Sequence, residues 1–165
     1  MQLTPIAEGI LRLTLPLPLG LDHVNCYLLR RPTGGWLLVD TGLGVPDWEE
    51  RWTGIVSQLD APLERVLVSH FHPDHVGGAA SLIKALPVGQ LSSSLETFHP
   101  LRAMLPAHQR CDAGQRWQWD GVDFEVLHPL AQDYASAHKP NAMSCVLRIG
   151  NGRSRALLVG DIEAA

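Results

Sequence analysis

The sequence predicts one α/β domain built as a sandwich of sheets and helices. The 165 residues suit a single domain and leave little room for a second. Apolar residues make up 45% of the chain and charged residues 18%, so a packed core is expected and long disorder is not. Strand-like segments come in runs with two helical segments between them, which favours an α/β sandwich over a purely wound parallel sheet.

The first half of the chain mixes strands with two helices. An alternating opening segment predicts a half-buried strand, and short apolar runs predict the strands that follow. Trp48, Trp52, Ile55 and Leu59 recur at helical spacing, so this segment is an amphipathic helix with its apolar stripe toward the core. The expected strands span residues 9–15, 25–30, 36–39 and 65–68, and the expected helices span residues 46–59 and 77–86.

The second half is mostly strand. Trp117 and Trp119 lie two positions apart on one arm of a hairpin, which favours a shared packed face over stacking on nucleic-acid bases. The expected strands and hairpins span residues 89–93, 115–127 with a turn at Asp120–Gly121, 143–149 and 155–159, and residues 96–113 are expected to form loop and short helix.

Charge and cysteine content narrow the function classes. The formal net charge of −4 argues against a protein held mainly by nucleic-acid backbone charge, although a nucleic-acid substrate approached through metal ions stays open. No apolar stretch reaches the roughly 20 residues of a membrane span, and no secretory signal is visible. The three cysteines, Cys26, Cys111 and Cys145, are an odd number, lie far apart and predict small buried apolar roles in a reducing compartment, so a cytoplasmic location is expected.

A cluster of histidines follows the expected strand at residues 65–68. On an extended backbone His70 and His72 project to the same side, and Pro73 then forces a turn that brings Asp74 and His75 round toward them. Two groups of imidazole and carboxylate ligands on one loop suit two divalent cations side by side, because a closed structural zinc site usually includes cysteine. Surface histidines on a polar loop are the alternative, which this spacing disfavours.

Three motifs occur in a fixed order along the chain: LVDTG at residues 38–42, HFHPDH at residues 70–75 and LLVGD at residues 157–161. Together they resemble the motifs of the metallo-β-lactamase-fold hydrolase superfamily. The resemblance implies an αββα sandwich with metal ions at one edge of the sheets, here shortened at its C-terminal end.

The resemblance also implies roles for individual residues. His70 and His72 would bind the first metal, Asp74 and His75 would bind the second, and Asp161 would bridge the two. Asp74 would in addition help to position the attacking water, which makes it the catalytic candidate. Zinc suits such a ligand set, and manganese, iron or cobalt are also compatible.

Further positions surround this set. Asp40 of the first motif would orient His70 or His75 from behind the metals. Asn141 stands where the third family motif normally has a histidine, and its carbonyl oxygen is a poorer zinc ligand than imidazole. His138 and His128 are spare candidates, each more simply read as a loop or strand-end residue.

The two halves of the chain resemble different relatives. Residues 16–28 look like the stand-alone hydrolases of the glyoxalase II and lactamase-like type. Residues 115–129, 141–147 and 160–163 look like the C-terminal domain of ComEC-type DNA-uptake proteins, in which asparagine is the ordinary residue at the position of Asn141. A fusion of two such sources near the shared metal loop is one hypothesis.

These observations lead to three candidate functions. The first is a metal-dependent hydrolase whose metal-activated hydroxide attacks a small-molecule phosphoester, either a phosphodiester or a phosphotriester. The second is a hydrolase of carbonyl substrates such as lactones, thioesters or β-lactams, and the third is a degenerate, non-enzymatic domain of a DNA-uptake protein. Because a shortened sandwich leaves an open strand edge, a homodimer is expected, and a second copy could supply a missing ligand such as His99 or His108.

Overall fold

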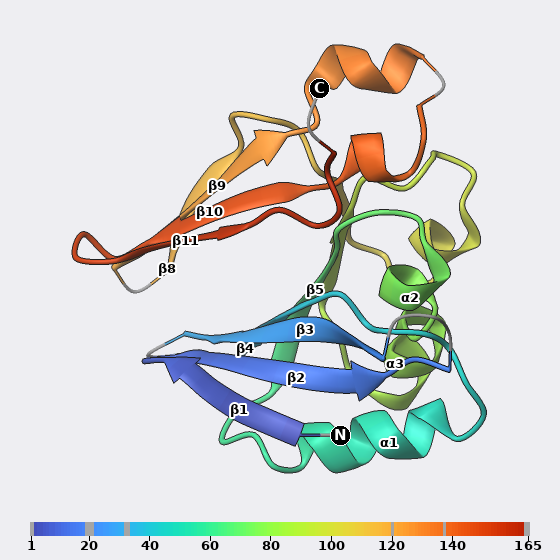
Figure 1. Cartoon of the computed structure of the whole chain (residues 1–165), viewed down its shortest axis with the longest axis vertical. Coiled ribbons are helices and arrows are strands. Elements are labelled where there is room, and N and C mark those ends of the chain that lie inside the picture. The colour runs from blue at the N-terminus through green and yellow to red at the C-terminus, as the bar shows by residue number, and fades with distance from the viewer. Residues whose placement is uncertain (1, 19–21, 32–33, 120, 137, 164–165) are drawn as a thin grey trace.

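The computed structural model describes residues 2–18, 22–31, 34–119, 121–136 and 138–163, and it contains two sheets (Figure 1). The large sheet has the order β1-β2-β3-β4-β5-β6-β7, antiparallel from β1 to β4 and parallel from β4 to β7. The small sheet is antiparallel, with the order β11-β10-β9-β8.

The strands of the large sheet are β1 (Gln2–Ala7), β2 (Ile10–Pro16), β3 (His23–Arg30), β4 (Trp36–Val39), β5 (Leu63–Val68), β6 (Gln90–Ser93) and β7 (His108–Arg110). Those of the small sheet are β8 (Arg116–Trp119), β9 (Val122–His128), β10 (Val146–Gly150) and β11 (Arg155–Leu158). The helices are α1 (Trp48–Val56), α2 (Pro73–Val76) and α3 (Ala79–Ala85), with 3-10 turns η1 (Pro100–Ala103), η2 (Ala131–Ala135) and η3 (Asn141–Met143).

Side-chain alternation along the central strands builds two apolar cores. Leu38 of β4 faces the helices and packs with Trp52 of α1 and Leu82 of α3. Its neighbours Leu37 and Val39 face the other way, toward the small sheet. The layers are therefore helix, large sheet and small sheet, as Figure 1 shows with α1 and the small sheet on opposite sides of β2 and β3.

The tryptophan pair of β8 belongs to the core between the sheets. Trp117 stacks on Phe124 with ring centroids 5.1 Å apart, and Trp119 meets the same ring at 5.0 Å. The guanidinium of Arg65, on β5 of the large sheet, lies 4.8 Å from the centroid of Trp119. The prediction of a shared packed face is confirmed, and these rings are engaged within the protein.

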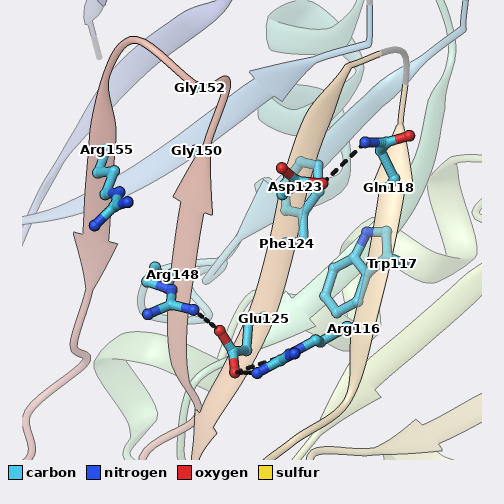
Figure 2. Close-up of a pocket in the computed structure, with 10 residues that line it drawn as sticks. All are labelled: Arg116, Trp117, Gln118, Asp123, Phe124, Glu125, Arg148, Gly150, Gly152 and Arg155. Atoms are coloured by element: carbon cyan, nitrogen blue, oxygen red, sulfur yellow. Dashed lines mark hydrogen bonds and ion pairs between the residues drawn. The ribbon is translucent and has the colours of Figure 1, made fainter.

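The outer face of the small sheet is charged rather than apolar. Glu125 accepts hydrogen bonds from both Arg116 and Arg148, and Gln118 donates to Asp123 at 3.0 Å (Figure 2). The hydrogen bond from Arg116 and the nearby guanidinium charges lower the pKa of Glu125. A hollow of about 580 Å³ lies over this network, and its carboxylates Asp123 and Glu125 are bonded to Gln118 and to two arginines.

Most expected elements are confirmed, but the strands β1 and β7 and the short elements α2, η2 and η3 were not predicted. The sequence prediction for residues 96–113 was incomplete, because β7 lies there beside η1. β7 is three residues long and carries polar side chains, so it lacks the apolar pattern that marks a strand. β1 was not predicted for a related reason, since it contains Pro5 and its side chains are mostly exposed. Asp120 of the expected turn lies outside the described residues.

The prediction of unpaired cysteines is wrong for Cys111 and Cys145. Cys111 and Cys145 form a disulfide across 34 residues, with Cα atoms 6.0 Å apart in the core between the sheets. Only the fold brings these positions together, so sequence spacing gave no signal of the pairing. Cys26 is buried and free, and burial raises the pKa of its thiol. The expected reducing compartment rested on unpaired thiols and loses that support. Among the described helices, none is long and apolar enough to cross a membrane.

Candidate metal centre

The histidine loop begins where β5 leaves the core. β5 ends at Val68, and the next residues, Ser69 and His70, are still fully buried. His72 has an extended backbone and precedes α2, whose first residue is Pro73, so the chain turns sharply at this point. The turn brings the imidazole of His75 back to that of His70, with ring centroids 4.2 Å apart.

A carboxylate from the small sheet completes this cluster. Asp161 follows β11, and its Oδ2 lies 3.5 Å from Nε2 of His75 and 3.8 Å from Nε2 of His70. One donor atom from each of the three residues lies within 4.8 Å of the other two. The cluster therefore joins the end of a large-sheet strand to the end of a small-sheet strand.

Asp40, directly after β4, supports both histidines from behind. Its Oδ2 accepts hydrogen bonds from Nδ1 of His75 at 2.9 Å and from the hydroxyl of Ser69 at 2.8 Å. Its Oδ1 accepts from the backbone N–H of Ser69 at 2.7 Å. An ionised carboxylate only accepts hydrogen bonds, so the Ser69 hydroxyl proton points to Asp40 and the Ser69 oxygen accepts from Nδ1 of His70 at 3.0 Å. In their neutral forms both imidazoles therefore keep the proton on Nδ1, which leaves Nε2 as the nitrogen that can bind a cation.

The protonation behaviour of the two histidines differs. Burial, helped by the nearby charge of His75, lowers the pKa of His70 to about 4. Burial also works against a charge on His75, but the hydrogen bond and the charge of Asp40, with Asp161 and Asp74 nearby, raise its pKa above the ordinary value. Asp40 therefore directs most of its stabilisation to His75.

The other two residues of the loop motif lie at the same place. Nδ1 of His72 is 3.2 Å from Nε2 of His70, and Oδ2 of Asp74 is 3.6 Å from Nε2 of His75. The fold thus brings together His70, His72, Asp74, His75 and Asp161, while the division of these residues between two metals stays a prediction.

The remaining candidates are placed differently. Asn141 donates from Nδ2 to Glu163 at 3.2 Å, and its Oδ1 is buried without a hydrogen-bond partner among the described residues. His138 lines a neighbouring pocket with Phe71 and Met143. His128 donates from Nδ1 to the Ser144 carbonyl at 3.0 Å. Asn141 is therefore the candidate whose ligand atom is left free.

Two serines that the sequence did not predict as site residues tie the site together. Ser69 links Asp40 to His70, and its position between a buried strand and the first histidine was the available signal. The Ser144 hydroxyl accepts from the backbone N–H of Asp161 at 3.2 Å, and Cys145 N–H donates to the Ser69 carbonyl at 2.7 Å. Ser144 is fully buried, and its hydroxyl supports the backbone of Asp161, which is a structural contact.

A cleft of about 320 Å³ opens beside the cluster, between β3 and β11. Asp74, His75 and Asp161 line it together with Asp40. The remaining lining is mixed: His23, Asn25 and Tyr27 are polar, and Leu17, Val24 and Leu157 are among the apolar residues. The cleft is large enough to admit a small molecule to the carboxylates and imidazoles.

Residues 19–165 match the family model described as "Metallo-beta-lactamase superfamily", and the chain belongs to this superfamily. It is 36% identical over 134 residues to "Uncharacterized protein YcaI" of Escherichia coli, an alignment that covers 79% of the chain and 16% of the relative. It is 35% identical over 140 residues to "Competence protein ComA" of Neisseria gonorrhoeae, and this alignment covers 82% of the chain and 18% of the relative. A third relative is "Lactamase-like protein aptB" of Emericella nidulans, 34% identical over 145 residues, covering 87% and 41%.

Solved structures support the same fold. A beta-lactamase domain protein from Burkholderia ambifaria superposes with a TM-score of 0.61 at 26% identity, over 75% of this chain and 48% of that one. A metallo-beta-lactamase from Pontibacter korlensis superposes with a TM-score of 0.64 at 22% identity, over 88% of this chain and 65% of that one. The predicted metallo-β-lactamase-like sandwich is confirmed.

Both predicted resemblances, to ComEC-type and to lactamase-like proteins, are confirmed. Single alignments of 140 and 145 residues extend across both halves of the chain, so no fusion is needed to explain the sequence. The chain spans between 12% and 18% of the length of the first three curated relatives.

Proposed function

We propose that the protein is a binuclear metal-dependent hydrolase of phosphoesters, either phosphodiesters or phosphotriesters. The observation that carries this proposal is the convergence of His70, His75 and Asp161 with both imidazoles held by Asp40 and Ser69. Hydrogen bonds that fix the tautomer of a metal-binding histidine are typical of such sites.

The donor atoms suit divalent metal ions. Imidazole nitrogen and carboxylate oxygen, without cysteine, are ligands for zinc, manganese, iron or cobalt in an open site. We assign His70 and His72 to one ion, Asp74 and His75 to the other, and Asp161 to both. The unpartnered Oδ1 of Asn141 is our candidate for an additional ligand. Bound ions supply a water of lowered pKa and positive charge for the transition state.

The side chains of this chain perform the remaining work. Asp40 and Ser69 hold the imidazoles so that no reorientation is needed when the ligands bind. Asp74, with 23% of its side chain exposed, faces the cleft and accepts a hydrogen bond from the attacking water. The apolar residues in the cleft lining limit competing water around the substrate.

Relatives named for competence and recombination favour phosphoesters, because nucleic acids are phosphodiesters. A carbonyl substrate is the second candidate, favoured by 30% identity over 125 residues to an atrochrysone carboxyl ACP thioesterase of Aspergillus fumigatus. That alignment covers 76% of this chain and 26% of the thioesterase.

The test is a comparison of substrates at matched metal loading. Elemental analysis first measures the metal content, and a chromogenic phosphodiester, a phosphotriester, a lactone and a cephalosporin are then assayed. Faster turnover of the phosphorus substrates, lost in His72→Ala and Asp161→Ala, is the expected result. Preferred cleavage of the lactone would favour the carbonyl candidate. Absence of stoichiometric metal, with no effect of either variant, would favour a non-enzymatic domain.

We also propose that the chain forms a homodimer. β11 is an edge strand of the small sheet, and Leu157 on it is 53% exposed. His108 Nε2 is bonded to the Ser93 hydroxyl at 2.8 Å, and His99 Nδ1 accepts from the backbone N–H of Leu101 at 3.3 Å, so each histidine has one ring nitrogen left for donation to a second copy. Size-exclusion chromatography with light scattering tests the assembly, and a monomer at micromolar concentration would contradict it.

A further inference from the structure

A second pocket, of about 290 Å³, adjoins the histidine loop and is separate from the cleft that His75 and Asp161 line. Its walls come from three loops, represented by Phe71, Phe98 and Met143. The imidazoles of His99 and His138 add hydrogen-bonding groups to a mainly apolar lining. Apolar pockets with a few polar groups are typical of small-molecule sites.

Each wall is connected to the metal centre through neighbouring residues. Phe71 stands between His70 and His72 in the sequence. On the second loop, the Ser94 hydroxyl donates to the carbonyl of Ser69 at 3.2 Å. On the third, Met143 precedes Ser144, which holds the backbone of Asp161. The pocket and the metal centre are therefore built on the same three segments of the chain.

The lining favours an aromatic group. Phe71 is 54% exposed and Phe98 is 83% exposed, although burial of such rings is strongly favourable. Phe71 already meets the His99 ring edge to face, with centroids 4.9 Å apart. Aromatic rings add attraction beyond area burial when they meet edge to face or offset. Large exposed rings beside a reactive centre mark a binding surface for a flat apolar group.

We propose that this pocket binds a planar aromatic substituent of the substrate ester, with Phe71 and Phe98 as specificity-determining residues. The inference rests on the proposed function, because it places part of the substrate of that same metal centre. Phosphodiesters with an aryl group are therefore preferred over those with a small alkyl group.

The kinetic test compares O-phenyl S-ethyl phosphorothioate with O-methyl S-ethyl phosphorothioate, which share an aliphatic thiol leaving group, so the phenyl ring is the only aromatic substituent in the comparison. The metal-loaded full chain is expected to prefer the phenyl ester in kcat/KM by about tenfold. Phe98→Ala should remove most of that preference, chiefly through KM. Ile6→Ala, which removes a half-exposed apolar side chain of β1, is the matched control and should retain the preference.

A binding test makes the inference independent of turnover. Calorimetry measures the affinity of the metal-loaded protein for phenylphosphonate and methylphosphonate, with the phenyl compound expected to bind about tenfold more tightly. Equal affinities, or a preference unchanged by Phe98→Ala, would overturn the pocket assignment. Hydrolysis that persists without aryl preference would leave the proposed function standing. Failure to hydrolyse any ester would instead contradict the function, and phosphonate binding would still decide the pocket.

Discussion

The two halves of the proposed metal centre are held in different ways. On the large sheet, Asp40, Ser69, His70 and His75 are at most 6% exposed and share a closed set of hydrogen bonds. On the small sheet, the side chain of Asp161 is 44% exposed, and its backbone N–H donates to the Ser144 hydroxyl at 3.2 Å. The first half is built into the core, and the second is attached at a sheet edge. We therefore expect substitutions in the second half to lower metal affinity alone, and substitutions in the first half to lower both metal affinity and the free energy of unfolding.

The largest expected loss of metal affinity comes from the exposed half. Asp161→Ala removes a proposed ligand of both ions, and zinc affinity should fall by more than about 100-fold, beyond the loss from a supporting residue. The free energy of unfolding of the metal-free protein should change by less than about 0.5 kcal/mol, because the side chain is half exposed. Competition with a chelator and chemical denaturation measure the two quantities. A large loss of stability would contradict the proposed difference between the halves.

A substitution in the buried half should lower both zinc affinity and the free energy of unfolding. Asp40→Asn keeps the size of the side chain but replaces one accepting oxygen by a donor, which leaves Ser69 or His75 without its acceptor. We expect zinc affinity to fall about 10- to 100-fold and stability to fall by about 2 kcal/mol.

A matched control separates this effect from general loss of charge. Asp60→Asn alters a carboxylate that is 67% exposed and paired with Arg30, so stability should change by less than about 1 kcal/mol. Zinc affinity should not change in the control. Equal effects of the two substitutions would show that Asp40 has no special role.

The disulfide should affect stability more than metal binding. The disulfide joins two residues that are 34 positions apart in the sequence. One of them, Cys145, also donates its backbone N–H to the Ser69 carbonyl beside the histidine loop. Replacing both Cys111 and Cys145 by serine should lower the free energy of unfolding by about 3 kcal/mol, with less than about tenfold loss of zinc affinity. Denaturation with and without reductant checks this, since reductant should destabilise only the protein that retains both cysteines. Identical curves for that protein would contradict the pairing.

The smallest effect is expected at Ser144. Ser144→Ala leaves the backbone N–H of Asp161 without its acceptor but keeps every proposed ligand. Stability should fall by about 1 kcal/mol and zinc affinity by about fivefold. Ser136→Ala, at an exposed position, is the control. An effect as large as that of Asp161→Ala would mean that the edge half is held by this one bond.

Local pattern was enough to predict much of the site. His70, His72, Asp74 and His75 are consecutive or nearly so, and strand and turn geometry alone bring them together. The family motifs place Asp40 and Asp161 directly after strands, and adjacent strand ends meet at one edge of a sandwich. The apolar periodicity of β2, β4 and α1 likewise depends only on neighbouring residues.

The sequence by itself thus determined the superfamily, the central strands and the residues that converge on the metal centre. Only the tertiary structure decided that Cys111 pairs with Cys145, that Asp40 binds both Ser69 and His75, and that Phe71 and Phe98 line one pocket. The physical reason is the distance along the chain over which each kind of interaction acts. Periodicity and turn chemistry act between neighbours, whereas these contacts join segments separated by 27 to 34 residues or more, whose meeting depends on how both sheets pack.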